Sequence, residues 1–137
     1  MMALTRLLLV ENEPKDLKIA VDVAREAGVT EIEARTNVPA ARNYLEKGLR
    51  GEEPLPDGIV LDLDMGRESG YELLRLWHST PRLTAIPILV WSVLGDEQRD
   101  MCKFFKVTAF VGKWEGPAAF REALEKLEPA SQAESAS

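Results

Sequence analysis

The stretch Gly58-Ile59-Val60-Leu61-Asp62-Leu63-Asp64-Met65-Gly66 decides the fold of this 137-residue chain. Its apolar run ends at Asp62, and turn-forming residues stand on both sides of it. A short apolar run between turn signals is typical of a strand that is buried on both faces of a parallel sheet. In an open α/β sheet, ligands and reactive groups gather outside the carboxyl ends of the strands. Asp62 is therefore predicted to lie at the reactive edge of the sheet.

The composition is that of one soluble globular domain. Hydrophobic residues make up 45% of the chain and charged residues 29%, and the net charge of −6 argues against a surface for nucleic acid. One cysteine and one histidine exclude a disulfide framework, a Cys-based zinc site and a Ser-His catalytic pair. The apolar run at residues 7–10 is too short for a signal peptide or a membrane span. We therefore expect a cytoplasmic protein.

Apolar runs and amphipathic stretches alternate along the chain. Strands are predicted at residues 7–10, 31–35, 58–62, 88–92 and 109–112, and helices at residues 14–27, 36–48, 69–80, 96–105 and 117–127. This α/β alternation predicts a doubly wound parallel sheet with helices on both faces, because parallel strands need right-handed crossovers. The chain is expected to form one domain at residues 5–128, followed by a disordered tail at residues 129–137 that has nothing to bury.

Polar residues follow the predicted strands at the points where the strands end. They are Glu11, Asn12, Glu13, Asp62, Asp64, Ser92 and Lys113. Carboxylates that crowd together repel one another, and a hard oxygen-binding cation such as Mg²⁺ relieves the repulsion. A hydroxyl and a lysine on the opposite side suit an anionic phosphoryl group. The set indicates Mg²⁺-dependent phosphoryl transfer onto Asp62, which would form an acyl phosphate.

Four motifs carry a resemblance to a known family across residues 5–127. They are LLLVENEP, IVLDLDMGRESGYELL, IPILVWS and AFVGKW. In this order and spacing they resemble the CheY-like receiver domain of two-component response regulators. The opening LVEN-x-P and the long DLDMGRESG loop resemble the stand-alone receivers associated with phytochrome-type kinases. The resemblance implies a flavodoxin-like sheet of five strands in the order 2-1-3-4-5.

The resemblance assigns a role to each polar residue by its place in the motifs. Asp62 matches the phosphoacceptor, and Ser92 and Lys113 match the residues that contact the phosphoryl group. Phe110 matches the aromatic residue that changes rotamer as a switch. The implied metal site comprises Glu11, Asn12, Asp62 and the backbone carbonyl of Asp64.

Four residues depart from the family pattern. Asn12 replaces a carboxylate that binds the metal directly, so Mg²⁺ binding is expected to be weak. Val93 stands where Ala or Gly is usual and is expected to crowd the route to Asp62, and Gly66 replaces a proline that stiffens the loop. Trp114 stands where a cis-proline is usual. A cis bond before a residue other than proline costs about 2.5–4 kcal/mol, so we expect a trans bond before Trp114. We also expect the loop that carries Lys113 and Trp114, called the lysine loop below, to be displaced.

The resemblance implies a stand-alone response regulator receiver rather than an enzyme. It would accept a phosphoryl group on Asp62 from a sensor histidine kinase or a phosphotransfer protein, and it would signal through protein–protein contacts. Neither nucleic acid nor a membrane is expected as a partner. The downstream protein stays open, and a homodimer through the face from the fourth to the fifth helix is one candidate contact.

Two alternatives remain. A degenerate receiver would serve as a binding or dimerisation module without phosphorylation, and the residues at positions 12, 93 and 114 favour it. The run Asp62-Leu63-Asp64 also matches the D-x-D motif of haloacid-dehalogenase-type phosphatases. Against that reading, the chain lacks the acidic pair that these phosphatases carry after a later strand.

The fourth predicted helix carries Met101, Phe104 and Phe105, which do not fit easily on one inward face. They indicate either core packing with one exposed aromatic residue or an interaction surface. Lys106 stands where glycine is usual after a helix, so an irregular helix end is expected.

Overall fold

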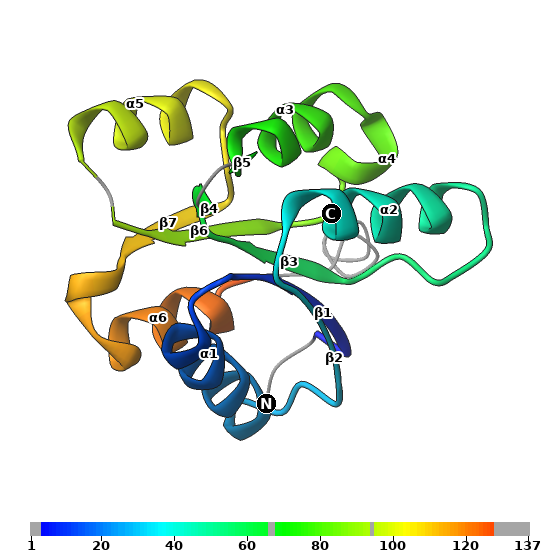
Figure 1. The fold of residues 1–137 in the computed structure, drawn as a ribbon. Helices are drawn as coiled ribbons and strands as arrows, with labels where there is room; N and C mark the ends of the chain where they lie inside the picture. Colours follow the sequence, from blue (N-terminus) through cyan, green and yellow to red (C-terminus); the bar gives the residue numbers. More distant parts are fainter. Residues whose placement is uncertain (1–3, 66–67, 94, 128–137) are drawn as a thin grey trace, which may run out of the picture.

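The computed structural model describes residues 4–65, 68–93 and 95–127. Within these residues, five strands form one parallel sheet: β1 (Arg6–Val10), β2 (Glu31–Arg35), β3 (Gly58–Leu61), β6 (Ile88–Ser92) and β7 (Ala109–Gly112). Their order is β2-β1-β3-β6-β7, which is 2-1-3-4-5 when these strands are counted along the chain (Figure 1). The predicted flavodoxin-like sheet is confirmed.

Helices cover both faces of the sheet, as the α/β alternation predicts. They are α1 (Pro14–Glu26), α2 (Val38–Leu49), α3 (Tyr71–Ser79), α4 (Pro81–Thr84), α5 (Asp96–Phe104) and α6 (Pro117–Glu125). Helices α1 and α6 lie on one face, and α2 to α5 lie on the other (Figure 1). Of the helices described, none has the length and apolar character that crossing a bilayer requires.

The side chains of β1 show why the chain needs both layers of helices. Leu8 and Val10 join the apolar cluster under α2 to α5, whereas Leu7 and Leu9 join the cluster against α1 and α6. All four are fully buried. Successive side chains of a strand point to opposite faces, so an unbroken apolar run is buried only where both faces are covered. The carboxyl edge of the sheet is left as the place where polar side chains gather.

Three short elements differ from the expectation. The predicted loop at residues 64–68 contains a small hairpin, in which β4 (Asp64–Met65) pairs antiparallel with β5 (Glu68–Ser69). No helix was predicted between residues 80 and 88, but Pro81 begins α4, because proline suits the first helical position. A 3₁₀ turn, η1 (Lys113–Glu115), follows β7. Elements of two to four residues carry too little periodic pattern to be predicted.

The end of α5 confirms the expected irregular helix end and shows where the two neighbouring aromatic residues lie. Lys106 adopts a left-handed backbone with φ of 56°, a conformation that usually favours glycine after a helix. Phe105 is buried and Phe104 is exposed, so one aromatic ring joins the core and the other faces solvent. The predicted tail and the Gly66 departure lie outside the described residues.

Candidate functional site

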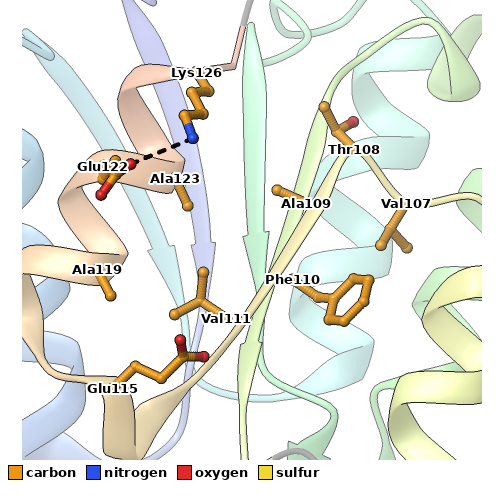
Figure 2. A pocket seen from close by; sticks show the side chains of 10 residues that line it. All are labelled: Val107, Thr108, Ala109, Phe110, Val111, Glu115, Ala119, Glu122, Ala123 and Lys126. Carbon is orange, nitrogen blue, oxygen red and sulfur yellow. Dashed lines mark hydrogen bonds and ion pairs between the residues drawn. The ribbon is translucent and has the colours of Figure 1, made fainter.

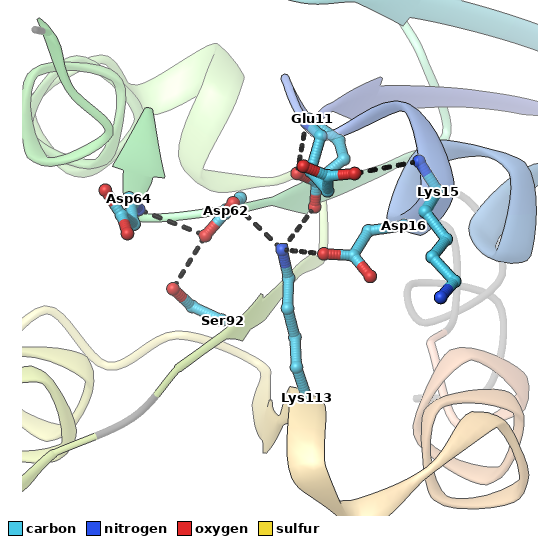
Figure 3. A network of polar contacts seen from close by, with 8 residues as sticks. Glu11, Lys15, Asp16, Asp62, Asp64, Ser92 and Lys113 are labelled. Carbon is cyan, nitrogen blue, oxygen red and sulfur yellow. Dashed lines mark hydrogen bonds and ion pairs between the residues drawn. The ribbon is translucent and has the colours of Figure 1, made fainter. Parts of the chain in front are cut away.

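Asp62 follows β3 at the carboxyl edge of the sheet and is 3% exposed. Its Oδ1 accepts a hydrogen bond of 2.7 Å from the Ser92 hydroxyl and one of 3.0 Å from the Asp64 backbone N–H (Figure 3). Ser92 ends β6, the strand that pairs with β3. The parallel register therefore brings the carboxylate and the hydroxyl together.

Lys113 follows β7 and reaches across the edge of the sheet toward Asp62 (Figure 3). Its nitrogen, Nζ, lies 3.1 Å from Asp62 Oδ2, 2.8 Å from Glu11 Oε1 and 2.7 Å from Asp16 Oδ2. The Trp91 ring centre lies 5.3 Å from Nζ, within the distance of a cation–π contact. The ammonium group thus faces three carboxylates: it donates hydrogen bonds to Asp16 and Asp62 and forms an ion pair with Glu11.

Burial and the contacts between Lys113 and the carboxylates shift the pKa values of Glu11 and Lys113. Burial raises the pKa of Glu11 to about 7, whereas the contact with Lys113 lowers it. Oε1 of Glu11 lies 2.8 Å from the ammonium but accepts no well-aligned hydrogen bond. Burial alone lowers the pKa of Lys113, but its contacts with the carboxylates of Asp16, Glu11 and Asp62 raise the pKa above the usual value. Lys113 is therefore the positive charge that allows several carboxylates to stay buried.

Two predicted site residues lie outside this network. The Asn12 side chain is exposed. Phe110 is half-buried on β7, with the Arg99 guanidinium 5.9 Å from its ring centre. Phe110 lines a cavity of about 370 Å³ along β7 and α6, where it lies on one side of the strand and Ala123 on the other (Figure 2). Asp62 does not line this cavity, so the described contacts do not connect Phe110 directly to the carboxylate.

No protein-family model matches the chain. The chain is 30% identical over 98 residues to the two-component response regulator ORR1 of rice (Oryza sativa subsp. japonica), and the match covers 69% of the chain and 42% of ORR1. The chain therefore spans less than half the length of this relative.

Several solved structures that are similar to the chain are response regulators. The phosphorylated cyanobacterial phytochrome response regulator RcpA has a TM-score of 0.75 at 24% identity, over 90% of each chain. The Mn²⁺-bound form of response regulator Rcp1 has a TM-score of 0.73 at 22% identity, over 88% of this chain and 89% of the other. The bacteriophytochrome response regulator RtBRR has a TM-score of 0.74 at 26% identity, over 90% of this chain and 76% of the other. The chain belongs to the response regulator receiver family.

In this receiver, Lys113 contacts Asp62 although the residue after it is not a cis-proline. The described residues contain no cis peptide bond, so the expected trans bond before Trp114 is confirmed. The Trp114 ring folds back over Gly112, where an added Cβ would come within 2.3 Å of the ring. The displacement expected of this loop does not take Lys113 out of the site, since Nζ still lies 3.1 Å from Asp62.

Val93 lies beside the receiver site and is 65% exposed. It lines a cavity of about 260 Å³ together with Ser92, Asp64, Tyr71 and other residues. Val93 and Ser92, whose hydroxyl contacts Asp62, thus line the same cavity. Crowding of the route to Asp62 stays a prediction.

Three residues of the receiver site are not predicted from the motifs. Asp16 lies in the first turn of α1, Trp91 precedes Ser92 in β6, and Gly70 precedes α3. A signal for Asp16 exists, because Pro14 marks the helix start and so places the first turn at the carboxyl edge of β1. No sequence signal shows that Trp91 would lie against the lysine.

Gly70 packs against the backbone at Asp62. A Cβ added at Gly70 would lie 2.5 Å from the Asp62 carbonyl oxygen and 2.8 Å from the Leu63 Cα, and neither atom can swing aside as a side chain can. We expect Gly70→Ala to destabilise the receiver by about 1–3 kcal/mol, the range of overpacking, as measured by urea unfolding. Gly95→Ala is the control, because its added carbon meets only the flexible end of Gln98. If the two variants were equally stable, Gly70 would not lie as close to the backbone of Asp62 and Leu63 as the structure shows.

Proposed function

We propose that this receiver accepts a phosphoryl group on Asp62 from a phosphohistidine of a sensor histidine kinase or phosphotransfer protein. One observation carries the proposal: the buried Asp62 carboxylate is held between the Ser92 hydroxyl at 2.7 Å and the Lys113 ammonium at 3.1 Å. These are the donors that a phosphoryl group bound to the carboxylate needs. The protein would act in the cytoplasm as a signalling phosphoprotein of a phosphorelay, not as an enzyme on other substrates.

The transfer exchanges one bond for another. A carboxylate oxygen of Asp62 attacks the phosphorus atom, so that an O–P bond forms while the N–P bond to the imidazole breaks. The imidazole takes the electron pair of the broken bond and, with a proton on its other nitrogen, leaves as a neutral ring. Lys113 offsets the charge of the moving phosphoryl group, and the Ser92 hydroxyl can turn from Asp62 Oδ1 to a phosphoryl oxygen.

The residues present fit a hard oxygen-binding cation that is held weakly. Glu11 offers a buried carboxylate oxygen without a well-aligned hydrogen bond, and Asp62 offers a second carboxylate. Among the residues that the structure describes, no group of three or more His, Cys, Asp or Glu side chains could hold a metal ion. The other ligands would be the neutral oxygens of Asn12 and of the Asp64 backbone carbonyl. When bound, Mg²⁺ would offset negative charge on the transferring phosphoryl group.

Asn12→Asp is expected to tighten Mg²⁺ binding by about 10-fold, because a charged oxygen replaces a neutral one. A magnesium titration followed by tryptophan fluorescence gives the dissociation constant. Asn37→Asp is the control, since it makes the same change at the N-cap of α2. The same affinity in both variants would contradict a ligand role for Asn12.

Phosphorylation would act on partners through the contacts of Ser92. Release of this hydroxyl from Asp62 would shift the end of β6 and, through β7, the region of Phe110. The surface formed by α5, β7 and α6 would then differ between the two states. We propose that a downstream protein, or a second copy of the chain, binds this surface.

A binding module that works without phosphorylation is the second candidate. The observation that favours it is that the Lys113 ammonium already contacts three carboxylates, those of Asp16, Glu11 and Asp62. The weak Mg²⁺ binding expected from the neutral oxygen of Asn12 also favours a binding module. The phosphatase alternative gains no support, because the similar proteins are response regulators.

Acetyl phosphate tests the proposed function in the presence of Mg²⁺. Intact-protein mass spectrometry should show one phosphoryl group per chain, which hydroxylamine removes because an acyl phosphate is labile to it. Chelation of Mg²⁺ should suppress the modification. An unchanged mass at saturating acetyl phosphate and Mg²⁺ would exclude the phosphoacceptor function and leave the binding module.

A further inference from the structure

The Lys113 ammonium has one contact that phosphoryl transfer does not itself require. Its shortest contact, at 2.7 Å, is with Asp16 Oδ2 (Figure 3). The two residues are 97 positions apart in the chain. Asp16 lies in the first turn of α1, and Lys113 opens η1 between β7 and α6. The contact therefore ties the lysine loop to a helix that the motifs of the site do not include.

Asp16 is itself held in place. Pro14 begins α1, and the Glu13 side chain caps the helix. The Asp16 side chain is 26% exposed and that of Lys113 is 16% exposed, so water competes only partly for their ion pair. The Lys18–Asp22 pair on the same helix is much more exposed, at 77% and 50%. An exposed pair of that kind contributes little, whereas a sheltered pair can fix a side chain.

The roles of the three carboxylates differ during the proposed reaction. Asp62 would become the acyl phosphate, and Glu11 would turn to the metal. Asp16 takes neither part, so its contact with Lys113 can persist through the transfer. A lysine side chain loses up to about 2 kcal/mol of rotamer entropy when it is held in place. Because the contact with Asp16 already holds Lys113, this entropy is lost before the phosphoryl donor binds and not during the transfer.

We propose that Asp16 is a positioning residue that holds the Lys113 ammonium against Asp62. It supplies the restraint for a loop that carries Trp114 in place of a cis-proline. The inference rests on the proposed function, since it concerns the lysine that would contact the phosphoryl group. Asp16 touches neither the donor nor the phosphoryl group and acts only through Lys113.

Two substitutions separate positioning from charge. Asp16→Asn removes the negative charge but keeps an oxygen that can accept from the ammonium, whereas Asp16→Ala removes both. Asp22→Asn makes the same change of charge on the same helix and breaks only the exposed pair with Lys18. A difference between the two Asp16 variants therefore reports positioning, and the Asp22 variant reports the effect of net charge.

The first readout is the rate of phosphorylation by acetyl phosphate with Mg²⁺. We expect the maximal rate to fall about 10-fold in Asp16→Ala and about 3-fold in Asp16→Asn, as misplacement of a group at the reacting centre does. The half-saturating concentration of acetyl phosphate should change little. Asp22→Asn should match the wild-type protein. Asp16→Asn also serves as the folded variant if Asp16→Ala does not fold.

The second readout is the ¹⁵N–¹H signal of the Lys113 ammonium in protein labelled with ¹⁵N-lysine. Ammonium protons that are held in hydrogen bonds exchange slowly with water, so the signal should be visible in the wild-type protein and in Asp22→Asn. It should weaken in Asp16→Asn and vanish in Asp16→Ala. Assignment by Lys113→Met identifies the signal.

The outcomes distinguish the inference from the proposed function. If the wild-type protein takes no phosphoryl group, the proposed function fails, and the Lys113 signal alone decides the role of Asp16. If the wild-type protein is phosphorylated and both Asp16 variants match Asp22→Asn in rate and signal, the positioning role is wrong and the proposed function stands. A faster rate in Asp16→Ala would also overturn it, because Asp16 would then hinder the reaction.

Discussion

Asp62→Asn is expected to abolish phosphoryl incorporation from acetyl phosphate while the receiver stays folded. An amide oxygen is neutral and does not replace a carboxylate as the nucleophile. The amide oxygen can accept the hydrogen bonds from the Ser92 hydroxyl and the Asp64 N–H that Asp62 Oδ1 accepts, and only the hydrogen bond from Lys113 to Oδ2 is lost. Intact-protein mass spectrometry measures incorporation, and urea unfolding shows that the fold is retained.

Asp64→Asn is the matched control for this loss. Asp64 is exposed, stands two positions further on, and contacts Asp62 only through its backbone N–H in the described hydrogen bonds. This variant should still take up one phosphoryl group. Incorporation that persists in Asp62→Asn would show that another residue is the acceptor. Loss in both variants would show that the loop, and not the Asp62 carboxylate, is what the reaction needs.

Lys113→Met is expected to cause the largest loss of stability among substitutions in the site. Methionine keeps an apolar stem beside Trp91 but removes the charge that faces the buried carboxylates of Glu11 and Asp62. Removing one partner of a buried ion pair leaves an uncompensated charge, which costs about 3 kcal/mol at neutral pH and above. Phosphorylation by acetyl phosphate should fall in the same variant, because no ammonium remains to offset the charge of the phosphoryl group.

The stability loss in Lys113→Met should depend on pH in a defined direction. Burial already raises the pKa of Glu11 from 4.5 to about 7, and loss of the lysine removes an interaction that lowers it. A carboxyl group whose folded pKa is raised binds more protons in the folded state, so the penalty is absent below the unfolded pKa and grows as the pH rises through the folded pKa. The loss should therefore be about 1 kcal/mol near pH 5 and about 3 kcal/mol near pH 8.

Urea unfolding at both pH values, in buffer with a chelator, measures this dependence. Lys18→Met is the control, because Lys18 pairs with Asp22 at an exposed position and its removal should cost little at either pH. A loss in Lys113→Met that is equal at the two pH values would contradict the assignment of the penalty to Glu11. A loss no larger than that of Lys18→Met would contradict the buried ion pairs altogether.

The sequence predicts the central strands of the sheet because each of them is a short, continuous run of apolar residues. The run before Asp62 and those at Leu7–Val10 and Ile88–Ser92 are bounded by turn signals, and all are buried strands of the sheet. The parallel order then places Asp62 and Ser92 on paired strands, where the structure finds their hydrogen bond. These predictions needed only local pattern and the geometry of parallel strands.

The remaining features depend on tertiary contacts that local pattern does not contain. Asp16 meets Lys113 only because α1 begins at the same edge of the sheet at which β7 ends. The need for glycine at position 70 arises from the Asp62 backbone and not from its own φ of −61°. The displacement expected of the loop at Lys113 follows from Trp114 alone, whereas the contact with Asp16 arises from the tertiary structure.

Reductive trapping tests the central claim, that Asp62 is the phosphoacceptor, most directly. Borohydride reduces an aspartyl phosphate to homoserine, and peptide mass mapping then locates the converted residue. We expect homoserine at position 62 in protein treated with acetyl phosphate and Mg²⁺, and none in untreated protein. Homoserine at any other aspartate position, or no conversion in a sample that carries phosphoryl groups, would contradict it.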